Sequence, residues 1–411
     1  MAQLALTRAG FPVSISGEFD TLTESALKRF QSTRGLVQDG IAGSRTWTAL
    51  KPYLTGSMLH TVKSGDTMYK LAAANASSVK AIKIANPSAD ANNLHIGSTL
   101  AIPLWFDVVP TDVRWCWPLM TAVREGLEMR YPHIRFNSLG KSVMGREILC
   151  AKIGAGSNEV FYNASHHANE WITTPVTLKF FEEYAHAYAY GDSIFGFDAG
   201  TLFDRSTLYI APLVNPDGVD LVTGDLPAGV YFQRAKRIAD SFPSVPFPDG
   251  WKANIEGVDL NLQYPAGWDE AREIKFSQGW NRPAPRDYPG TNPLEAPEPL
   301  SLYNFTLARN FSLTLSYHTQ GEVIYWQYGD SDPPRAYEIG LEFQRISGYR
   351  LESVPTESAN AGYKDWFIDK FFKPAYTIEA GSGSSPLPIE QFEIIYRKNR
   401  GILTTGLIIS I

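Results

Sequence analysis

Three side chains that lie far apart in the sequence could together bind a metal ion. His167 follows an apolar run that ends at Ala164, and Glu170 stands three residues later, before a helix expected to start near Thr174. An imidazole and a carboxylate at this spacing, where a strand turns into a helix, can converge on one ion. A catalytic zinc site needs three protein ligands and an open position for water. His318, at the end of another apolar run, is the best candidate for the third ligand.

The apolar runs around these residues predict the strands and helices that must position them. Strands are expected at residues 148–153, 160–164, 208–214, 312–317, 323–328 and 375–378. Helices are expected at residues 174–189, 297–310, 335–347 and 389–407. This alternation predicts one α/β domain over residues 110–411, with a largely parallel or mixed sheet covered on both faces. Because ligands bind at strand ends in such folds, we expect the catalytic groups there.

Length and composition narrow the class of protein. The chain has 411 residues, enough for two or three domains at roughly 150 residues each. Lys+Arg 37 against Asp+Glu 43 gives a formal charge of −6, which argues against a nucleic-acid partner bound by phosphate neutralisation. We also expect no membrane span, since no run of about 18 apolar residues occurs, and no signal peptide is visible. Cys116 and Cys150 are expected to be reduced, with one disulfide between them as the alternative.

Two small units precede the α/β domain. Residues 16–27 and 39–50 form a short repeat in which a glycine turn precedes a helical run, and they resemble the three-helix peptidoglycan-binding domain, expected at residues 1–55. A strand, helix, helix, strand pattern follows and resembles a LysM module, a βααβ unit expected at residues 58–105. The resemblance implies that residues 1–105 bind the glycan strands of peptidoglycan.

Six sequence blocks in the rest of the chain resemble the zinc carboxypeptidase A family. They are residues 140–146, 167–171, 215–218, 257–261, 316–318 and 376–379, and they occur in the order that the family has. The resemblance implies the family's carboxypeptidase-like α/β fold, a mixed eight-stranded sheet with helices on both faces. It also implies one Zn²⁺ ion per catalytic domain.

The same resemblance implies roles for individual residues. His167, Glu170 and His318 would be the zinc ligands. Glu379 would be the general base that takes a proton from a zinc-activated water. Asp259 would hold the first histidine in its metal-binding tautomer.

Three positions depart from the carboxypeptidase pattern. Asn261 would bind substrate, but Leu262 stands where the family has an arginine that grips a C-terminal carboxylate, which argues against exopeptidase action. Lys252 stands where the family has an arginine that stabilises the transition state, and an ammonium can do this as a point charge. The family's mobile substrate tyrosine falls at Glu357, which makes the nearby Tyr363 the candidate for that role.

Residues 251–261 and 279–290 are most similar to the bacterial γ-D-glutamyl-diamino acid endopeptidases. Those enzymes cut peptidoglycan stem peptides between γ-D-glutamate and meso-diaminopimelate or lysine. The resemblance implies a zinc-dependent hydrolase of that bond, with the stem peptide in the catalytic cleft. Arg282, Arg286 and Lys252 could then bind substrate carboxylates, and solvated loop arginines are the alternative for the first two.

Two other functions stay open at this point. The chain could be a zinc carboxypeptidase that trims the C-terminal residue of stem peptides, or a cell-wall-binding protein without catalysis. The location implied by the wall-binding modules is the bacterial cell wall or the spore, by an export route that the sequence leaves unidentified.

Overall fold

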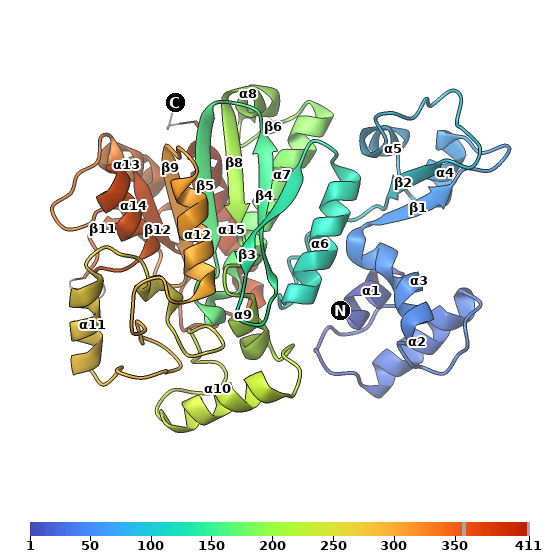
Figure 1. Ribbon diagram of the computed structural model, residues 1–411. Coiled ribbons are helices and arrows are strands. Elements are labelled where there is room, and N and C mark those ends of the chain that lie inside the picture. The colour runs from blue at the N-terminus through green and yellow to red at the C-terminus, as the bar shows by residue number, and fades with distance from the viewer. Residues whose placement is uncertain (356–358, 409–411) are drawn as a thin grey trace. The chain divides into compact units, whose positions relative to one another are not determined.

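The computed structural model describes residues 1–355 and 359–408, and these residues fall into two compact units (Figure 1). The first unit comprises residues 1–113 and 118–135, and the second comprises residues 114–117 together with residues from 136 onward. Helix α6, Trp117–Arg130, therefore belongs almost entirely to the first unit. The three domains expected from the sequence, with a boundary near residue 110, stay a prediction.

The first unit begins with a helical part. Its helices are α1 Ala2–Arg8, α2 Thr21–Thr33 and α3 Ser44–Thr55. Phe30 of α2 is fully buried, and its ring packs edge-on against Phe11 and Tyr53. Asp20 caps α2 by accepting a hydrogen bond from the backbone N–H of Thr23 at 2.8 Å. A small helical core of this kind is what the repeat predicts.

The second part of the first unit has the predicted order of strand, helix, helix and strand. Its elements are β1 Ser57–Thr61, α4 Met68–Ala74, α5 Val79–Ala85 and β2 Thr99–Pro103. β1 and β2 pair antiparallel, with Ser57 opposite Pro103. Buried side chains from the helices and from β2, Leu71, Ile82 and Ile102 among them, form a separate core. The βααβ arrangement is confirmed.

Helix α6 is bound to this unit through Arg130, which is buried. Its guanidinium donates hydrogen bonds to the backbone carbonyl oxygens of Gly56, Leu104 and Phe106, at 2.6, 3.1 and 2.9 Å. These carbonyls precede β1 and follow β2, so one side chain joins both ends of the βααβ part to α6.

The second unit is built on a mixed sheet that, within its described residues, has eight strands. In spatial order they are β11 Arg350–Glu352, β10 Val323–Tyr325, β12 Ala375–Glu379, β9 Leu313–His318, β5 Asn158–Ala164, β8 Ser206–Ala211, β4 Glu147–Gly154 and β3 Arg135–Lys141. The four central strands β12, β9, β5 and β8 are parallel to one another, while β10 and β4 join them antiparallel. The predicted mixed eight-stranded sheet is confirmed.

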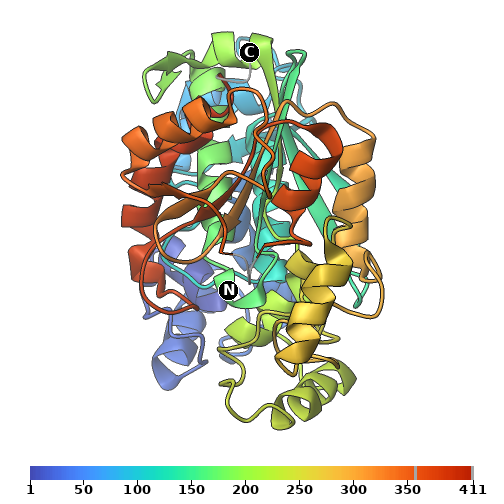
Figure 2. The same cartoon turned by 90° about the vertical axis from the view of Figure 1, so that its left-hand side faces the viewer.

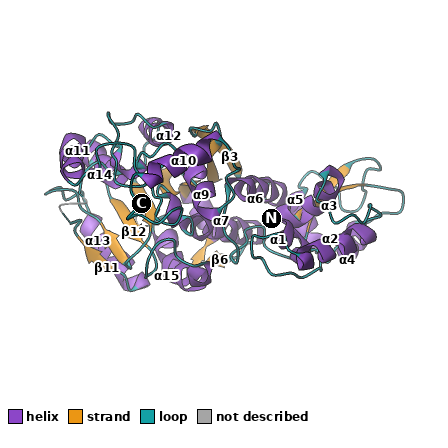
Figure 3. Cartoon of the chain, turned by 90° about the horizontal axis from the view of Figure 1, so that it is seen from below, coloured by secondary structure: helices purple, strands orange, loops and turns teal. Residues whose placement is uncertain are grey.

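Helices cover both faces of this sheet (Figures 2 and 3). Phe161 of β5 packs in the same core as Leu302 of α12 and Ile368 of α14. The next residue, Tyr162, points to the opposite face and donates its hydroxyl hydrogen bond to the carbonyl of Leu403 in α15 at 2.9 Å. The alternating orientation of neighbouring residues in a strand therefore sets the two layers. The main helices are α7 Thr173–Tyr190, α12 Pro297–Leu307, α13 Ala336–Ser347, α14 Tyr363–Phe371 and α15 Phe392–Thr405.

Further helices complete the second unit. They are α8 Ala199–Arg205, α9 Pro216–Thr223, α10 Val230–Asp240, α11 Trp268–Ser277, η1 Ala168–Glu170, η2 Leu260–Leu262 and η4 Ile389–Gln391. A two-stranded hairpin, β6 Ser193–Ile194 and β7 Phe197–Asp198, follows α7. Cys116 and Cys150 are both buried, and no disulfide joins them in the described residues. Among residues 1–355 and 359–408, no helix has the length and apolar character needed to span a membrane.

Candidate metal centre and its pocket

Three neighbouring parallel strands end at the same edge of the sheet and bring the candidate residues together. β5 ends at Ala164, just before His167, while β9 ends at His318 and β12 ends at Glu379. His318 and Glu379 are direct partners in the pairing of β9 with β12. Residues more than 200 positions apart in the sequence thus meet because parallel strands align their carboxyl ends.

The turn after β5 is fixed by its own hydrogen bonds. Ser165 adopts a left-handed conformation with φ of 54°, and its N–H donates to the hydroxyl of Thr173 at 3.0 Å. The side-chain amide of Asn215 donates to the carbonyl oxygen of His166 at 3.1 Å. The single turn η1 then carries Glu170 back beside His167. Asn215 therefore helps to hold the backbone that positions His167 and Glu170.

His167, Glu170 and His318 form a compact group of metal-binding atoms. Nδ1 of His167 lies 2.9 Å from Oε1 of Glu170, and Nδ1 of His318 lies 2.9 Å from Oε2 of the same carboxylate. The two Nδ1 atoms lie 3.3 Å apart. One ligand atom from each residue falls within 4.8 Å of the others. Two imidazole nitrogens and one carboxylate are the donor set of a catalytic zinc site, so the residues present fit this ion.

Asp259 orients the first of these histidines. Its Oδ1 lies 3.2 Å from Nε2 of His167, and its Oδ2 accepts a hydrogen bond from the backbone N–H of Asp287 at 3.0 Å. Burial alone would raise the pKa of Asp259, but the charge of His167 and this hydrogen bond hold it well below its usual range. An ionised Asp259 keeps the proton of His167 on Nε2, which leaves Nδ1 as the electron-pair donor.

Glu170 is also in contact with Lys252. The ammonium of Lys252 lies 3.1 Å from Oε1 of Glu170, whose side chain is 1% exposed. Burial opposes ionisation of Glu170, yet His167 and Lys252 keep its pKa well below the usual value. Lys252 thus lies beside the candidate metal ligands, where a cation can stabilise negative charge.

Glu379 is partly buried next to the same group. Burial and the charge of Glu170 raise the pKa of Glu379 to about 8, while Lys252 opposes this rise. A divalent cation held by Glu170 would offset the negative charge that raises the pKa. Glu379 is therefore a carboxyl group whose proton affinity can match proton transfer near neutral pH.

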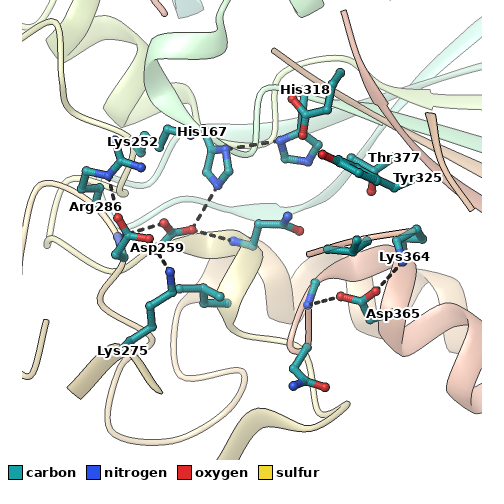
Figure 4. A pocket seen from close by; sticks show the side chains of 17 residues that line it. His167, Lys252, Asp259, Lys275, Arg286, His318, Tyr325, Lys364, Asp365 and Thr377 are labelled. Atoms are coloured by element: carbon teal, nitrogen blue, oxygen red, sulfur yellow. Dashed lines mark hydrogen bonds and ion pairs between the residues drawn. The ribbon is translucent and has the colours of Figure 1, made fainter. Parts of the chain in front are cut away.

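A pocket of about 200 Å³ lies next to this group at the strand ends (Figure 4). His167, His318 and Glu379 lie on one part of its wall, together with Lys252. Other parts of the wall carry charged side chains arranged in ion pairs. Lys275 contacts Asp287 at 2.8 Å, and Lys364 contacts Asp365 at 2.5 Å.

The pocket contains some of the predicted substrate-binding residues and excludes others. Asn261 and Arg286 line it, as Lys252 does. Arg282 is absent from the described residues of its wall, and the exposed guanidinium stacks on Phe242 with 5.2 Å to the ring centre. This exposed position favours the alternative of a solvated loop arginine for Arg282. Glu357 lies outside the described residues.

Tyr363 needs a correction. The structure buries it completely, and its hydroxyl bonds to the hydroxyl of Thr306 at 2.8 Å. Tyr363 begins α14, with its ring in the aromatic core beside Tyr264 and Trp366. Tyr363 is close in sequence to the position where the family has its tyrosine, but the start of this helix turns the side chain into the core. It does not line the pocket among the described residues.

Several pocket residues were not predicted. They are Lys275, Asp287, Tyr325, Lys364 and Asp365. Lys275 lies in α11 and Asp287 in a loop, both far from any strand end that the sequence pattern marks. In the sequence, Lys364 and Asp365 are marked only as a lysine next to an aspartate at the start of a helix. Such pairs are common on protein surfaces, so the pattern does not indicate a pocket.

Comparison with known proteins places the chain in a family. The zinc carboxypeptidase family model matches residues 120–400. The peptidoglycan-binding domain model matches residues 1–50, and the LysM model matches residues 60–103. The chain belongs to the zinc carboxypeptidase family and is a hydrolase of the metallopeptidase class, with a peptidoglycan-binding domain and a LysM domain before the catalytic part.

Individual relatives agree with this assignment. The chain is 44% identical over 283 residues to γ-D-glutamyl-L-diamino acid endopeptidase 1 of Lysinibacillus sphaericus. The matched region covers 68% of this chain and 69% of that protein. The chain is 40% identical over 280 residues to the uncharacterized protein YqgT of Bacillus subtilis (strain 168), covering 67% and 73%. Bovine thrombin-activatable fibrinolysis inhibitor, in complex with tick carboxypeptidase inhibitor, has a similar fold, with a TM-score of 0.54 and 17% identity over 72% of this chain and 97% of that chain.

Proposed function

We propose that this metallopeptidase hydrolyses the amide bond between γ-D-glutamate and the diamino acid, meso-diaminopimelate or L-lysine, in the stem peptides of peptidoglycan. The relative from Lysinibacillus sphaericus carries this specificity in its name, and the two N-terminal domains fit the same polymer. Association with the bacterial cell wall follows from those domains, and association with the spore stays a prediction.

One combination of features carries the proposal. The candidate zinc ligands and Glu379 are those of a metallopeptidase, and the pocket wall is apolar at Leu262. Leu262 lines the pocket and packs against Trp268, Ala271 and Ala361. A leucine here offers no partner for the C-terminal carboxylate of a substrate, which a carboxypeptidase must bind. The site therefore suits cleavage within a peptide better than removal of its last residue.

The residues of the site can divide the chemistry between them. A zinc ion held by His167, Glu170 and His318 would polarise the carbonyl group and acidify water. Glu379 would accept the proton of the attacking water and deliver it to the leaving amine nitrogen. Lys252 would stabilise the negative charge that develops on the carbonyl oxygen.

Pocket residues next to this group would bind the peptide. Asn261 and Arg286 line the pocket on the side of Asp259, and the side-chain oxygen of Asn261 accepts a hydrogen bond from the backbone N–H of Tyr363 at 3.2 Å. D-Glutamate linked through its γ-carbonyl keeps a free α-carboxylate, and a guanidinium suits such a group. We infer that Arg286 binds it.

The N-terminal domains would act by raising the local concentration of the catalytic part on the wall. Linking weak binding modules to a catalytic domain increases apparent affinity without new contacts at the active site. The full chain with Glu379→Gln should therefore sediment with purified peptidoglycan sacculi, whereas free chain in the supernatant would argue against this role.

Incubation with the free tetrapeptide L-Ala-γ-D-Glu-diaminopimelate-D-Ala tests the bond specificity. The proposal predicts release of the dipeptide L-Ala-D-Glu, detected by mass. Release of the terminal D-Ala alone would instead support a carboxypeptidase, and no release from a zinc-loaded chain would support a wall-binding protein without catalysis.

A further inference from the structure

Two cations and a carboxylate form a linked group on the pocket wall next to Asp259. Asp287 bridges the cations: its Oδ1 lies 2.8 Å from Nζ of Lys275, and its Oδ2 accepts a hydrogen bond from Nε of Arg286 at 2.6 Å. The side chains of Lys275 and Asp287 are 12% and 17% exposed, whereas that of Arg286 is 40% exposed. Figure 4 shows Lys275 and Arg286 on the same side of the pocket as Asp259. The group thus combines a half-buried ion pair with a guanidinium that a ligand can reach.

Backbone hydrogen bonds fix this group beside the metal centre. The carbonyl oxygen of Pro285 accepts a hydrogen bond from the backbone N–H of Lys252 at 2.8 Å. Two residues further on, the backbone N–H of Asp287 donates to Oδ2 of Asp259 at 3.0 Å. Arg286 therefore lies between an attachment to Lys252 and an attachment to Asp259. Because the backbone is already held at both points, the loop does not need the ion pairs of its side chains to keep its position.

The charges of this group do not cancel. Burial and the charge of Asp259 oppose ionisation of Asp287, yet Arg286 and Lys275 keep the pKa of Asp287 below its usual value. Burial also opposes the charge of Arg286, but the carboxylates of Asp287 and Asp259 keep the pKa of Arg286 above its usual value. One ionised carboxylate stands between two cations, which leaves one positive charge that the group does not neutralise by itself.

Both cations keep hydrogen-bond donors for a ligand. A guanidinium has five N–H donors, and Arg286 uses the one on Nε for Asp287. Within residues 1–355 and 359–408, no hydrogen bond joins its two terminal nitrogens to the protein. Lys275 has three donors, of which one is turned to Asp287. The free edge of the guanidinium carries two parallel donors, the arrangement that binds a carboxylate through both of its oxygens.

The proposed substrate carries a carboxylate at a suitable distance from the bond that is cleaved. In γ-linked D-glutamate, three carbon atoms separate the carbonyl carbon that water attacks from the free α-carboxylate, a span of about 5 Å when extended. The carbonyl oxygen would point towards Lys252. Arg286 is close to that ammonium: burial and the charge of Arg286 both oppose the raised pKa of Lys252, which Glu170 maintains. When the carbonyl oxygen lies next to Lys252, the α-carboxylate can therefore reach the neighbouring guanidinium.

We propose that Lys275 and Arg286, joined by Asp287, bind the α-carboxylate of D-glutamate and make the site specific for stem peptides in which this carboxylate is free. This inference rests on the proposed function and deepens it, because it names the form of the stem peptide that is cleaved. A peptide in which a carboxamide replaces this carboxylate, as in D-isoglutamine, turns an NH2 group towards N–H donors and leaves a cation without its partner. Such a peptide is a poor substrate.

Two tripeptides test this specificity without any variant. L-Ala-γ-D-Glu-diaminopimelate and L-Ala-D-isoGln-diaminopimelate differ only in having a carboxylate or a carboxamide on the second residue. They are compared by kcat/KM with the full zinc-loaded chain. We expect the peptide with the free carboxylate to be preferred by about tenfold or more, because only this peptide satisfies the donors of the two cations. Equal rates, or a preference for the carboxamide, would overturn the proposal.

Single variants show whether the two cations cause the preference. Arg286→Met and Lys275→Met each remove one charge and should move the ratio of the two kcat/KM values towards one. Lys236, which forms an exposed ion pair with Asp240 in α10, provides the control, and Lys236→Met should leave the ratio at its wild-type value. A wild-type ratio in one variant would remove that residue from the site, and a wild-type ratio in both would contradict the proposal. Thermal unfolding checks that each variant is folded, and Arg286→Gln and Lys275→Gln are the milder substitutions.

A second pair of peptides identifies which carboxylate is bound. L-Ala-γ-D-Glu-diaminopimelate is compared with the peptide in which only the carboxylates of the diaminopimelate are amidated. The proposal predicts that Arg286→Met and Lys275→Met leave this second ratio at its wild-type value. If they change the second ratio and leave the first unchanged, the cations bind the leaving amino acid, and the proposal is wrong.

A binding measurement separates this inference from the proposed function. Calorimetric titration of the Glu379→Gln chain with the D-glutamate and D-isoglutamine tripeptides needs no turnover. Tighter binding of the D-glutamate peptide, lost in the chain that also carries Arg286→Met, would support the carboxylate site even if another bond were cleaved. Cleavage at γ-D-glutamate with equal binding of both peptides would support the proposed function and overturn the role of Lys275 and Arg286.

Discussion

Glu379 and His318 stand directly opposite each other where the parallel strands β12 and β9 end. This register places a partly buried carboxyl group beside a candidate zinc ligand without any contribution from a flexible loop. Because both residues are strand residues, their relative position depends on the backbone hydrogen bonds of the sheet centre. The arrangement gives the proposed mechanism its most direct test by mutation.

Replacing Glu379 with Gln should abolish turnover but retain the metal. Glutamine keeps the shape of the side chain and cannot accept the proton of water, so we expect a loss of about 10²–10⁴-fold in kcat. Zinc content, measured by atomic absorption, should match that of the unaltered chain. Activity within a few-fold of the unaltered chain would remove Glu379 from the role of general base.

Replacing His318 with Ala should remove the metal. Two of the three converging ligands, His167 and Glu170, would be left, which is fewer than a catalytic zinc site uses. The purified variant should contain little zinc, whereas the unaltered chain should contain one ion. The exposed His186, in α7, provides the control, and His186→Ala should retain the ion. Equal zinc in the His318 variant would place the metal elsewhere.

Asp259→Asn should weaken zinc binding without removing a ligand. The amide has no negative charge to hold the proton of His167 on Nε2, so we expect a 10- to 100-fold lower affinity. Competition with a chromophoric chelator measures this constant. An unchanged affinity would show that the contact between Asp259 and His167 does not tune the site.

Glu298 should make the stability of the catalytic part depend on pH. It is fully buried in the first turn of α12, and burial raises its pKa from the usual 4.5 to about 7. The folded state therefore binds this proton more tightly than the unfolded state. The resulting stabilisation is complete below pH 4.5 and is lost as the pH rises through 7.

Glu298→Gln should remove that pH dependence. The amide resembles the neutral acid, so the fall in stability of the unaltered chain between pH 5 and pH 8 should shrink by on the order of 1–3 kcal/mol in the variant. Urea unfolding at both pH values measures the change, with the exposed Glu390→Gln as the control. The same fall in all three proteins would mean that Glu298 stays ionised when folded.

The residues at strand ends could be predicted from the sequence because each follows a run of apolar residues. His167, His318 and Glu379 all stand at such a point, and the structure brings them together with Glu170. The central strands are buried on both faces, which makes their runs continuous and easy to recognise.

The edge strands gave a much weaker signal. β3, Arg135–Lys141, is mostly exposed or half-buried, and β11, Arg350–Glu352, has only three residues. Neither contains an apolar run or a regular alternation, so neither was predicted. Their position at the sheet edges depends on pairing with β4 and β10, which local sequence does not encode.

The rest of the pocket wall depends on tertiary packing. Lys275 and Asp287 meet because α11 and the loop that follows it fold back on Asp259. Tyr363 and Lys364 are neighbours in sequence, yet the start of α14 sends the first into the core and the second to the pocket. A shift of one residue at a helix start exchanges these roles, and spacing in the sequence cannot resolve it.

Cleavage of L-Ala-γ-D-Glu-diaminopimelate-D-Ala in water enriched in ¹⁸O tests the central claim most directly. The account predicts that the unaltered chain releases L-Ala-D-Glu with one ¹⁸O atom in its new γ-carboxyl group, and that Glu379→Gln releases almost none. Release of D-Ala with ¹⁸O in the remaining tripeptide, and no labelled dipeptide, would contradict it.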